Sequence, residues 1–166
     1  MFPGLESFDR SDLNLDRGFS MQLGNEAGRE YVARLEEAAD FLTQRISRFP
    51  NILIILGSGL GGLADDVERA DTIPYDSIPH MPRSTTEGHA GELIVGSIGE
   101  RDVALFNGRV HCHDGLHPRD VAFGVRLMAL MGVTDVIVTN AAGSLNPDMN
   151  VGDHVVLTNH ISLFFF

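Results

Sequence analysis

The 166-residue sequence has a single cysteine, few positive charges and no long apolar run. One cysteine, Cys112, excludes a disulfide within the chain and is typical of a reducing compartment, so we predict a cytoplasmic protein. No apolar stretch approaches the roughly 20 residues that a membrane-spanning helix needs, so no association with a membrane is predicted. The N-terminal segment MFPGLESFDR also lacks the basic and then apolar parts of an export signal.

The charge balance is strongly acidic, because 12 Lys and Arg residues stand against 23 Asp and Glu residues, a formal net charge of -11. Such a chain repels nucleic acids at long range, so no nucleic-acid partner is predicted. An anionic ligand would need a local group of donors, which makes the few Arg and His residues near glycines informative. Hydrophobic residues make up 43% of the chain and charged residues 21%, as in globular proteins.

The spacing of apolar residues predicts alternating helices and strands. Residues 1–26 have no clear period and are interpreted as an extension before one domain, residues 27–166. Residues 71–86 contain three prolines and are expected to be mostly loop. The expected helices are 27–47, a short one after a glycine-rich turn up to about residue 68, and 117–132. The expected strands are 52–56, 92–98, 102–108, 135–140 and one that begins at 154, with the first and fourth buried. This order predicts an α/β fold in which helices flank a mixed β-sheet.

Three glycines directly after the first predicted strand fit the pattern G-x-G-x-x-G: Gly57, Gly59 and Gly62. A dinucleotide-binding fold needs a second parallel strand that ends in an acidic residue about 20 residues further on. Asp76 has roughly that spacing, but the surrounding prolines disfavour a strand there. A glycine-rich turn can instead bind a lone phosphate through backbone N–H groups, here with the Ser58 hydroxyl as a further donor. The glycines alone leave a phosphate site and a turn without a ligand equally open.

Other predicted strand ends favour the phosphate site. His89 lies between two glycines before a strand, whereas Arg109 and His111 follow one. On an extended backbone, Arg109 and His111 would point to the same face. Arginine offers a planar fork to phosphate oxygens, and histidine can donate from a ring nitrogen. Asn140 and the small residues after it would let a ligand approach the backbone at another strand end. Each residue alone could be ordinary polar surface, but their combination favours an anion site.

Four segments in the same order resemble the N-terminal part of the trimeric purine nucleoside phosphorylases: GSGLGGL, PRSTTEGHAGEL, GRVHCHDG and VTNAAGSLNPDMNVGDHVVLTNHISL. The similarity runs from about Glu36 to Leu163. It implies a nucleoside phosphorylase fold whose C-terminal part is missing. It also implies a homotrimer that uses inorganic phosphate, without a metal or other cofactor, to cleave purine nucleosides and 2′-deoxynucleosides into free base and (deoxy)ribose 1-phosphate.

The resemblance implies a role for each matching residue. Phosphate would contact the side chains of Ser58, His89, Arg109 and His111 and the backbone of Ala141, with His111 as the catalytic member. The nucleoside would contact Asn140 and His113. The family has a ribose-binding tyrosine at the position of His113, where imidazole can also stack and donate, and a glutamate at the position of Asp114. Phosphate is itself the nucleophile, so positioning and electrostatics carry the catalysis.

In this family a glutamate and an asparagine of the C-terminal part stabilise the departing purine, so we expect the isolated chain to turn over slowly or not at all. Two alternatives stay open. The first is a metal-dependent hydrolase that uses His111, His113, Asp114 and His117, since two histidines at i and i+2 on a strand can share a metal ion. The second is an inactive scaffold that keeps the phosphate site without the reaction.

Overall fold

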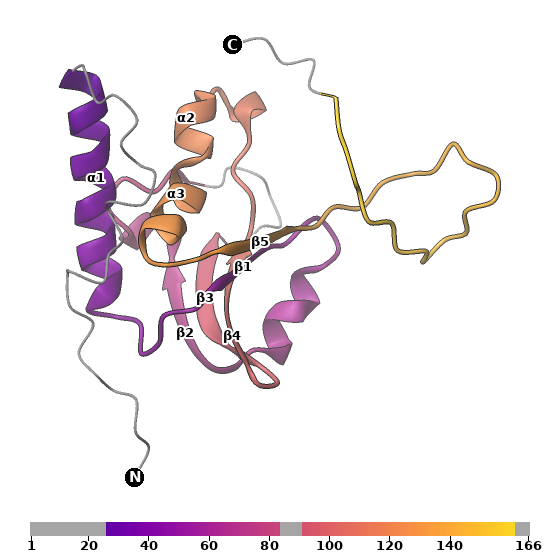
Figure 1. Ribbon diagram of the computed structural model, residues 1–166, viewed down its shortest axis with the longest axis horizontal. Helices are drawn as coiled ribbons and strands as arrows, with labels where there is room; N and C mark the ends of the chain where they lie inside the picture. Colours follow the sequence, from indigo (N-terminus) through magenta and orange to yellow (C-terminus); the bar gives the residue numbers. More distant parts are fainter. Residues whose placement is uncertain (1–25, 84–90, 162–166) are drawn as a thin grey trace.

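The computed structural model describes residues 26–83 and 91–161 (Figure 1). In chain order its elements are α1 (Glu26–Thr43), β1 (Ile52–Ile55), the 3-10 helix η2 (Gly61–Asp66), β2 (Glu68–Pro74), the 3-10 helix η3 (Tyr75–Ser77), β3 (Glu92–Ile98), β4 (Arg101–Asn107), the 3-10 helix η4 (Cys112–Asp114), α2 (Pro118–Val121), α3 (Phe123–Leu130) and β5 (Asp135–Val138). The predicted N-terminal extension, residues 1–26, lies outside the described residues except for Glu26, the first residue of α1. In the described part of the chain, no helix has the length and apolar character to cross a membrane.

The described strands form one mixed sheet in the order β2-β3-β4-β1-β5 (Figure 1). β1 pairs in parallel with β4 on one side and with β5 on the other, whereas β3 runs antiparallel to both β2 and β4. This arrangement confirms the predicted α/β fold with a mixed sheet flanked by helices. Because parallel neighbours run the same way, β1, β4 and β5 all end at one edge of the sheet. β3 begins there too, since its first residue, Glu92, pairs with Asn107 at the end of β4.

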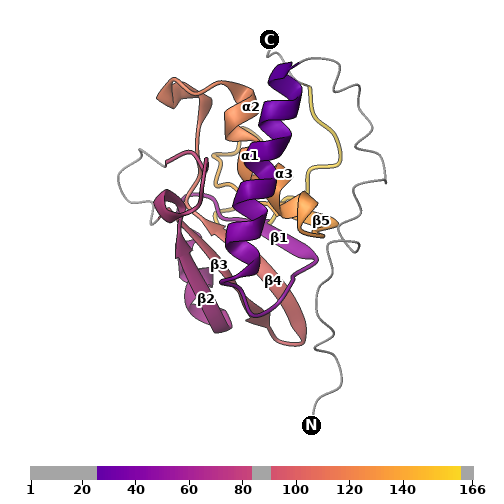
Figure 2. The same cartoon turned by 90° about the vertical axis from the view of Figure 1, so that its left-hand side faces the viewer.

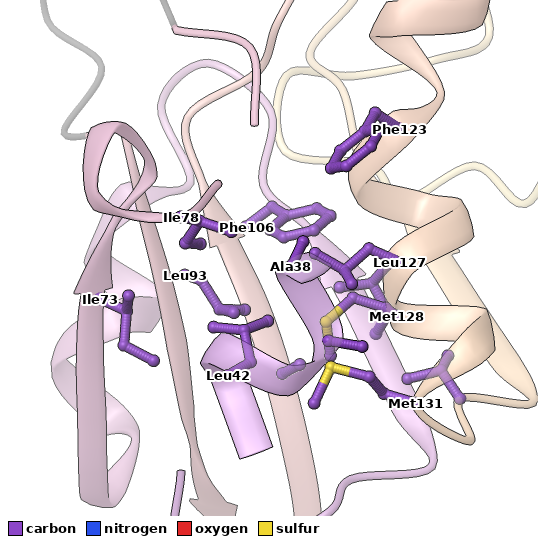
Figure 3. Close-up of a cluster of buried hydrophobic side chains, with 14 of the residues drawn as sticks. Ala38, Leu42, Ile73, Ile78, Leu93, Phe106, Phe123, Leu127, Met128 and Met131 are labelled. Atoms are coloured by element: carbon purple, nitrogen blue, oxygen red, sulfur yellow. The ribbon is translucent and has the colours of Figure 1, made fainter. Parts of the chain in front are cut away.

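Alternating side chains of the strands supply a hydrophobic core on each face of the sheet. The larger core lies where α1 and α3 cover one face (Figure 2). Figure 3 shows its side chains, from both the sheet and the helices: Leu42, Leu93, Phe106, Phe123, Leu127 and Met128 among others. Their strand neighbours point to the opposite face, where Ile94 and Leu105 pack with Leu63 of η2. The first predicted helix forms as α1 and buries one apolar face against this core, which includes Leu35, Ala39 and Leu42.

The expectation that residues 71–86 are mostly loop is wrong for their first part. Residues 68–74 form β2, which pairs antiparallel with β3. β2 is an edge strand, and of its seven residues only Ile73 is fully buried. The apolar alternation that predicts a strand is therefore missing from its sequence. Pro74 does not interrupt the strand, because it is the last residue and edge strands tolerate proline.

The structure also corrects three expectations in the C-terminal third of the chain. The predicted helix 117–132 is two helices, α2 and α3, which meet at Ala122. Strand β5 exists as predicted but is not buried, because every one of its residues is exposed. No strand forms over residues 154–161, the described part of the segment in which one was expected to begin. The second and third errors share a physical cause, because an apolar run predicts a buried strand only where the described residues supply a packing partner.

Candidate active site

The ends of β1 and β5 are joined at Gly57. Its N–H donates to Thr139 Oγ1 over 2.8 Å, and the same hydroxyl donates to the Ile55 carbonyl oxygen over 3.0 Å. A Cβ at residue 57 would lie 2.5 Å from the Thr139 carbonyl oxygen and 2.7 Å from Asn140 Cα, so this position requires glycine. The contact places the loop that begins at Ser58 beside the loop that begins at Asn140.

The glycine-rich loop itself makes a tight turn after β1. The Leu60 N–H donates to the Gly57 carbonyl oxygen over 3.1 Å, and Gly59 has a φ of +83°, which glycine adopts without strain. Ser58 is exposed in this turn. The predicted short helix follows as the six-residue 3-10 helix η2. The loop can therefore offer a hydroxyl and backbone N–H groups to an anion.

Arg109 and His111 follow the end of β4, beside the end of β1. The Leu56 N–H donates to the Phe106 carbonyl oxygen over 3.1 Å, which holds the two strand ends together. Both Arg109 and His111 are partly buried. The His111 side chain accepts the Asp114 N–H, while the Asp114 carboxylate accepts the His111 N–H over 3.3 Å. When one nitrogen of a neutral imidazole accepts, the other carries the proton. In its neutral form, His111 can therefore donate to an anion from its second ring nitrogen.

His113 lies directly against His111. The two ring centroids are 4.7 Å apart and the planes are inclined by 16°, so the imidazoles are stacked. The His113 side chain is 74% exposed, and its Nε2 lies 3.9 Å from Asp114 Oδ1. The stack keeps His113 at the rim of the candidate site. That position suits the predicted contact with a nucleoside, which stays a prediction.

A cavity of about 350 Å³ opens at the same edge of the sheet. Ile55 and Val138, the last residues of β1 and β5, line it together with Phe106, the residue before the end of β4, and with residues of α2 and α3. Its wall is mostly apolar, and Arg109 contributes the charged group. Ser58, His111, His113, Asn140 and Ala141 are not among the lining residues. The cavity therefore lies beside the candidate phosphate site and shares Arg109 with it.

Tyr75 of η3 is one of the residues that line the cavity. Burial, and to a smaller extent the charge of Glu92, raises the pKa of the Tyr75 phenol far above its usual range. The phenol therefore stays protonated and donates to the Gly108 carbonyl oxygen over 2.8 Å. Sequence reasoning missed both Tyr75 and Thr139, because each acts on the backbone of a segment distant in sequence. The sequence gives one indication of the role of Thr139, its position near the end of a predicted strand, and none for Tyr75.

The structure brings most of the predicted site residues to one edge of the sheet: Ser58, Arg109, His111, His113, Asn140 and Ala141. His89 lies outside the described residues. Gly91, the first described residue after it, donates its N–H to the Asn107 carbonyl oxygen over 2.9 Å, at the same edge. The individual roles of these residues stay predictions.

The metal-site hypothesis gains no support from the structure. Within residues 26–83 and 91–161, no group of three or more His, Cys, Asp or Glu side chains is arranged to hold a metal ion. His117 instead begins α2, where its Nδ1 accepts the Arg119 N–H over 3.1 Å. His111 and His113 stack ring on ring, an arrangement that does not converge on a shared ion.

Known proteins resemble this chain both in sequence and in fold. The chain belongs to the phosphorylase superfamily, whose family model matches residues 51–166. The relatives that it matches are purine nucleoside phosphorylases, as the sequence resemblance implied. Purine nucleoside phosphorylase 1 of Geobacillus stearothermophilus is 45% identical over 128 residues, which are 77% of this chain and 47% of that protein. The mouse (Mus musculus) enzyme is 41% identical over 128 residues, which are 77% of this chain and 44% of that protein.

Solved structures agree with this relationship. Isoform 2 of purine nucleoside phosphorylase from Schistosoma mansoni, in complex with cytosine and ribose-1-phosphate, matches with a TM-score of 0.68 and 38% identity. The match covers 73% of this chain and 42% of that one. A Schistosoma mansoni complex with inosine matches with a TM-score of 0.67 and 39% identity, over 74% of this chain and 42% of that one. The chain thus has the nucleoside phosphorylase fold and spans a little under half the length of the curated relatives it matches.

Proposed function

We propose that this chain forms the phosphate-binding part of a purine nucleoside phosphorylase. The observation that carries the proposal is the convergence of β1, β4 and β5 at one edge, where the loops with Ser58, Arg109 and Asn140 begin. These loops offer a hydroxyl, a guanidinium and backbone groups in an otherwise acidic protein. Membership of the phosphorylase superfamily supports the reaction class.

The proposed reaction uses inorganic phosphate as nucleophile. The fork of Arg109, the ring N–H of His111, the Ser58 hydroxyl and the Ala141 backbone hold the dianion. A phosphate oxygen forms a bond to the anomeric carbon while the glycosidic bond breaks, and the bonding electrons leave with the purine. The bound anion stabilises the positive charge that develops on the sugar, and fixed donors need no reorganisation at that moment. His111 is the catalytic member of this set, and no cofactor is required.

His113 and Asn140 contact the nucleoside in this proposal. The stack on His111 holds the His113 ring next to the anion, where it can pack on a ribose and donate to a hydroxyl. Asn140 directly follows Thr139, which fixes the end of β5 to that of β1. Asn140 therefore follows backbone that the sheet holds in place, whereas His113 lies in η4 and is held by its stack on His111.

A calorimetric titration of the 166-residue protein with inorganic phosphate tests the proposal, together with an assay of hypoxanthine release from inosine. We expect phosphate to bind at one site per chain. Because the chain spans less than half the length of its relatives, we expect little turnover of inosine. A protein that binds no phosphate would contradict the proposal. Phosphate binding without any turnover, together with stable self-association, would support the inactive scaffold instead.

We further propose a homotrimer that acts in the cytoplasm. The resemblance to trimeric purine nucleoside phosphorylases supports the assembly, and the single cysteine supports the compartment. Sedimentation equilibrium gives the mass of the assembly directly. A mass of three chains agrees with the proposal, and a stable monomer contradicts it.

A further inference from the structure

Tyr75 touches two segments of the candidate site at once. Its hydroxyl donates to the Gly108 carbonyl oxygen over 2.8 Å, in a buried hydrogen bond. Its backbone N–H donates to the Gly91 carbonyl oxygen over 2.8 Å. Gly108 immediately precedes Arg109, and Gly91 comes directly before β3. One residue thus connects the end of β4 with the start of β3.

The bond to Gly108 acts on the peptide group from which Arg109 extends. The carbonyl of residue 108 and the N–H of residue 109 share one planar unit, so fixing the oxygen fixes the direction of the Arg109 backbone. Gly108 has a φ of +124°, in a region that glycine enters freely. No side chain at residue 108 restrains this peptide group. The Tyr75 hydroxyl supplies a restraint from a distant segment.

The ring of Tyr75 is itself held firmly. Tyr75 is only 2% exposed. Its ring packs edge to face against that of Phe106, with centroids 5.7 Å apart and planes inclined by 88°. Phe106 lies two residues before Gly108 in β4. The hydroxyl is thus aimed at Gly108 by packing against the same strand that it restrains.

We propose that Tyr75 is a positioning residue for anion binding, which sets the direction of Arg109 through its hydroxyl and ties that strand end to the start of β3 through its backbone. The choice of phosphate as the anion rests on the proposed function. Tyr75 acts through Arg109 rather than on the substrate, since its hydroxyl is directed at the Gly108 carbonyl oxygen.

Tyr75→Phe tests the proposal, because it removes the hydroxyl and keeps the ring. Tyr31→Phe is the matched control. Tyr31 is the other tyrosine of the chain, and its hydroxyl also donates to a distant carbonyl oxygen, that of Arg119, over 3.0 Å. Its ring also meets a phenylalanine edge to face, Phe123, with centroids 5.9 Å apart and planes inclined by 88°. Each variant loses one hydrogen bond from a tyrosine hydroxyl to a distant carbonyl oxygen. Only the bond lost in Tyr75→Phe lies at the strand ends of the candidate site.

Two measurements are compared between the variants. In calorimetric titration with inorganic phosphate, we expect Tyr75→Phe to bind about three- to tenfold more weakly and Tyr31→Phe to stay within about twofold of the wild type, as loss of one hydrogen bond allows. In hydrogen exchange followed by mass spectrometry, we expect faster exchange over residues 108–111 in Tyr75→Phe alone. Similar thermal unfolding temperatures would show that the difference between the variants is local.

The outcomes separate this proposal from the proposed function. Wild-type affinity in Tyr75→Phe overturns the positioning role. Unchanged exchange over residues 108–111 also overturns it, whether or not phosphate binds. A wild-type protein that binds no phosphate contradicts the proposed function, while the exchange measurement still decides whether Tyr75 restrains the Arg109 segment.

Discussion

At the scale of the residue, the absence of one Cβ lets the ends of β1 and β5 meet. Gly57→Ala would place a methyl group 2.5 Å from the Thr139 carbonyl oxygen and 2.7 Å from Asn140 Cα. Both atoms are backbone, so the end of β5 must move away. We expect the free energy of unfolding to fall by about 1–3 kcal/mol, as overpacking does elsewhere, and phosphate to bind more weakly. Urea denaturation and calorimetry measure the two effects.

Gly62→Ala, in the 3-10 helix η2 that follows the same loop, is the control. A Cβ there has no neighbour within 4 Å, so we expect the free energy of unfolding to change by no more than about 0.5 kcal/mol. Equal losses in the two variants would show that the approach of β5 is not the reason for glycine at residue 57.

Arg109→Ala should weaken phosphate binding about 10- to 100-fold, because a hydrogen bond between charged groups contributes about 1.5–3 kcal/mol. Calorimetric titration with phosphate measures the loss. Arg48→Ala is the control, since Arg48 forms an ion pair of 2.6 Å with Asp102 near the opposite end of β4. Wild-type affinity is expected for this variant. An Arg109→Ala protein with the affinity of the control would remove Arg109 from the site.

The sequence points to the candidate donors that the structure places at the strand ends, whereas it does not point to the residues that hold these strand ends together. Ser58, Arg109 and His111 stand out because donors follow predicted strands and have local glycine or histidine neighbours. Thr139 and Tyr75 act on partners 82 and 33 positions away. A hydroxyl bound to a distant backbone group leaves no local pattern in the sequence.

At the scale of the element, buried strands could be predicted and an exposed edge strand could not. β3 has five fully buried residues among seven and was predicted from its apolar run. β2 has one among seven, and most of its sequence predicts a loop. The junction between α2 and α3 at Ala122 has no glycine or proline to mark it, so one helix was predicted. A run of apolar residues indicates a buried segment. It therefore predicts strands well when they are buried and poorly when they are exposed.

The junction of β1 and β5 gives a prediction at this scale. Thr139→Val keeps the shape of the side chain but removes the acceptor for the Gly57 N–H and the donor to Ile55. A partly buried N–H then lacks its partner, so we expect the free energy of unfolding to fall by about 1–3 kcal/mol. Hydrogen exchange over residues 56–58 should become faster.

Thr134→Val provides the comparison at the opposite end of β5. The Thr134 hydroxyl is exposed and donates to the neighbouring Asp135 carboxylate over 2.8 Å. Its loss should change the free energy of unfolding by no more than about 0.5 kcal/mol. If Thr134→Val lowered the free energy of unfolding as much as Thr139→Val, the hydrogen bonds between the ends of β1 and β5 would make no special contribution to stability.

At the scale of the whole molecule, the described chain exposes apolar surface along β5 and after it. Val136, Ile137 and Val138 are 45%, 50% and 62% exposed, and Val156 in the extended segment is 87% exposed. An edge strand of this kind favours association with other chains. We expect sedimentation velocity to show species that grow with concentration, and Ile137→Lys to reduce them, because an edge lysine opposes strand pairing.

Val151→Lys is the control for this surface, since Val151 is fully exposed in the loop that follows. A charge there should leave the association unchanged. Equal sedimentation of Ile137→Lys and the wild type would show that β5 is not the contact.

The meeting of three strand ends also has a kinetic consequence. β1 pairs with β4 and with β5, which are distant from it in the chain, so the donors come together only when these long-range pairings exist. An anion that binds as proposed would therefore stabilise the native state and would not be needed for folding. Added phosphate should lengthen the lifetime of the native state and leave the speed of refolding nearly untouched.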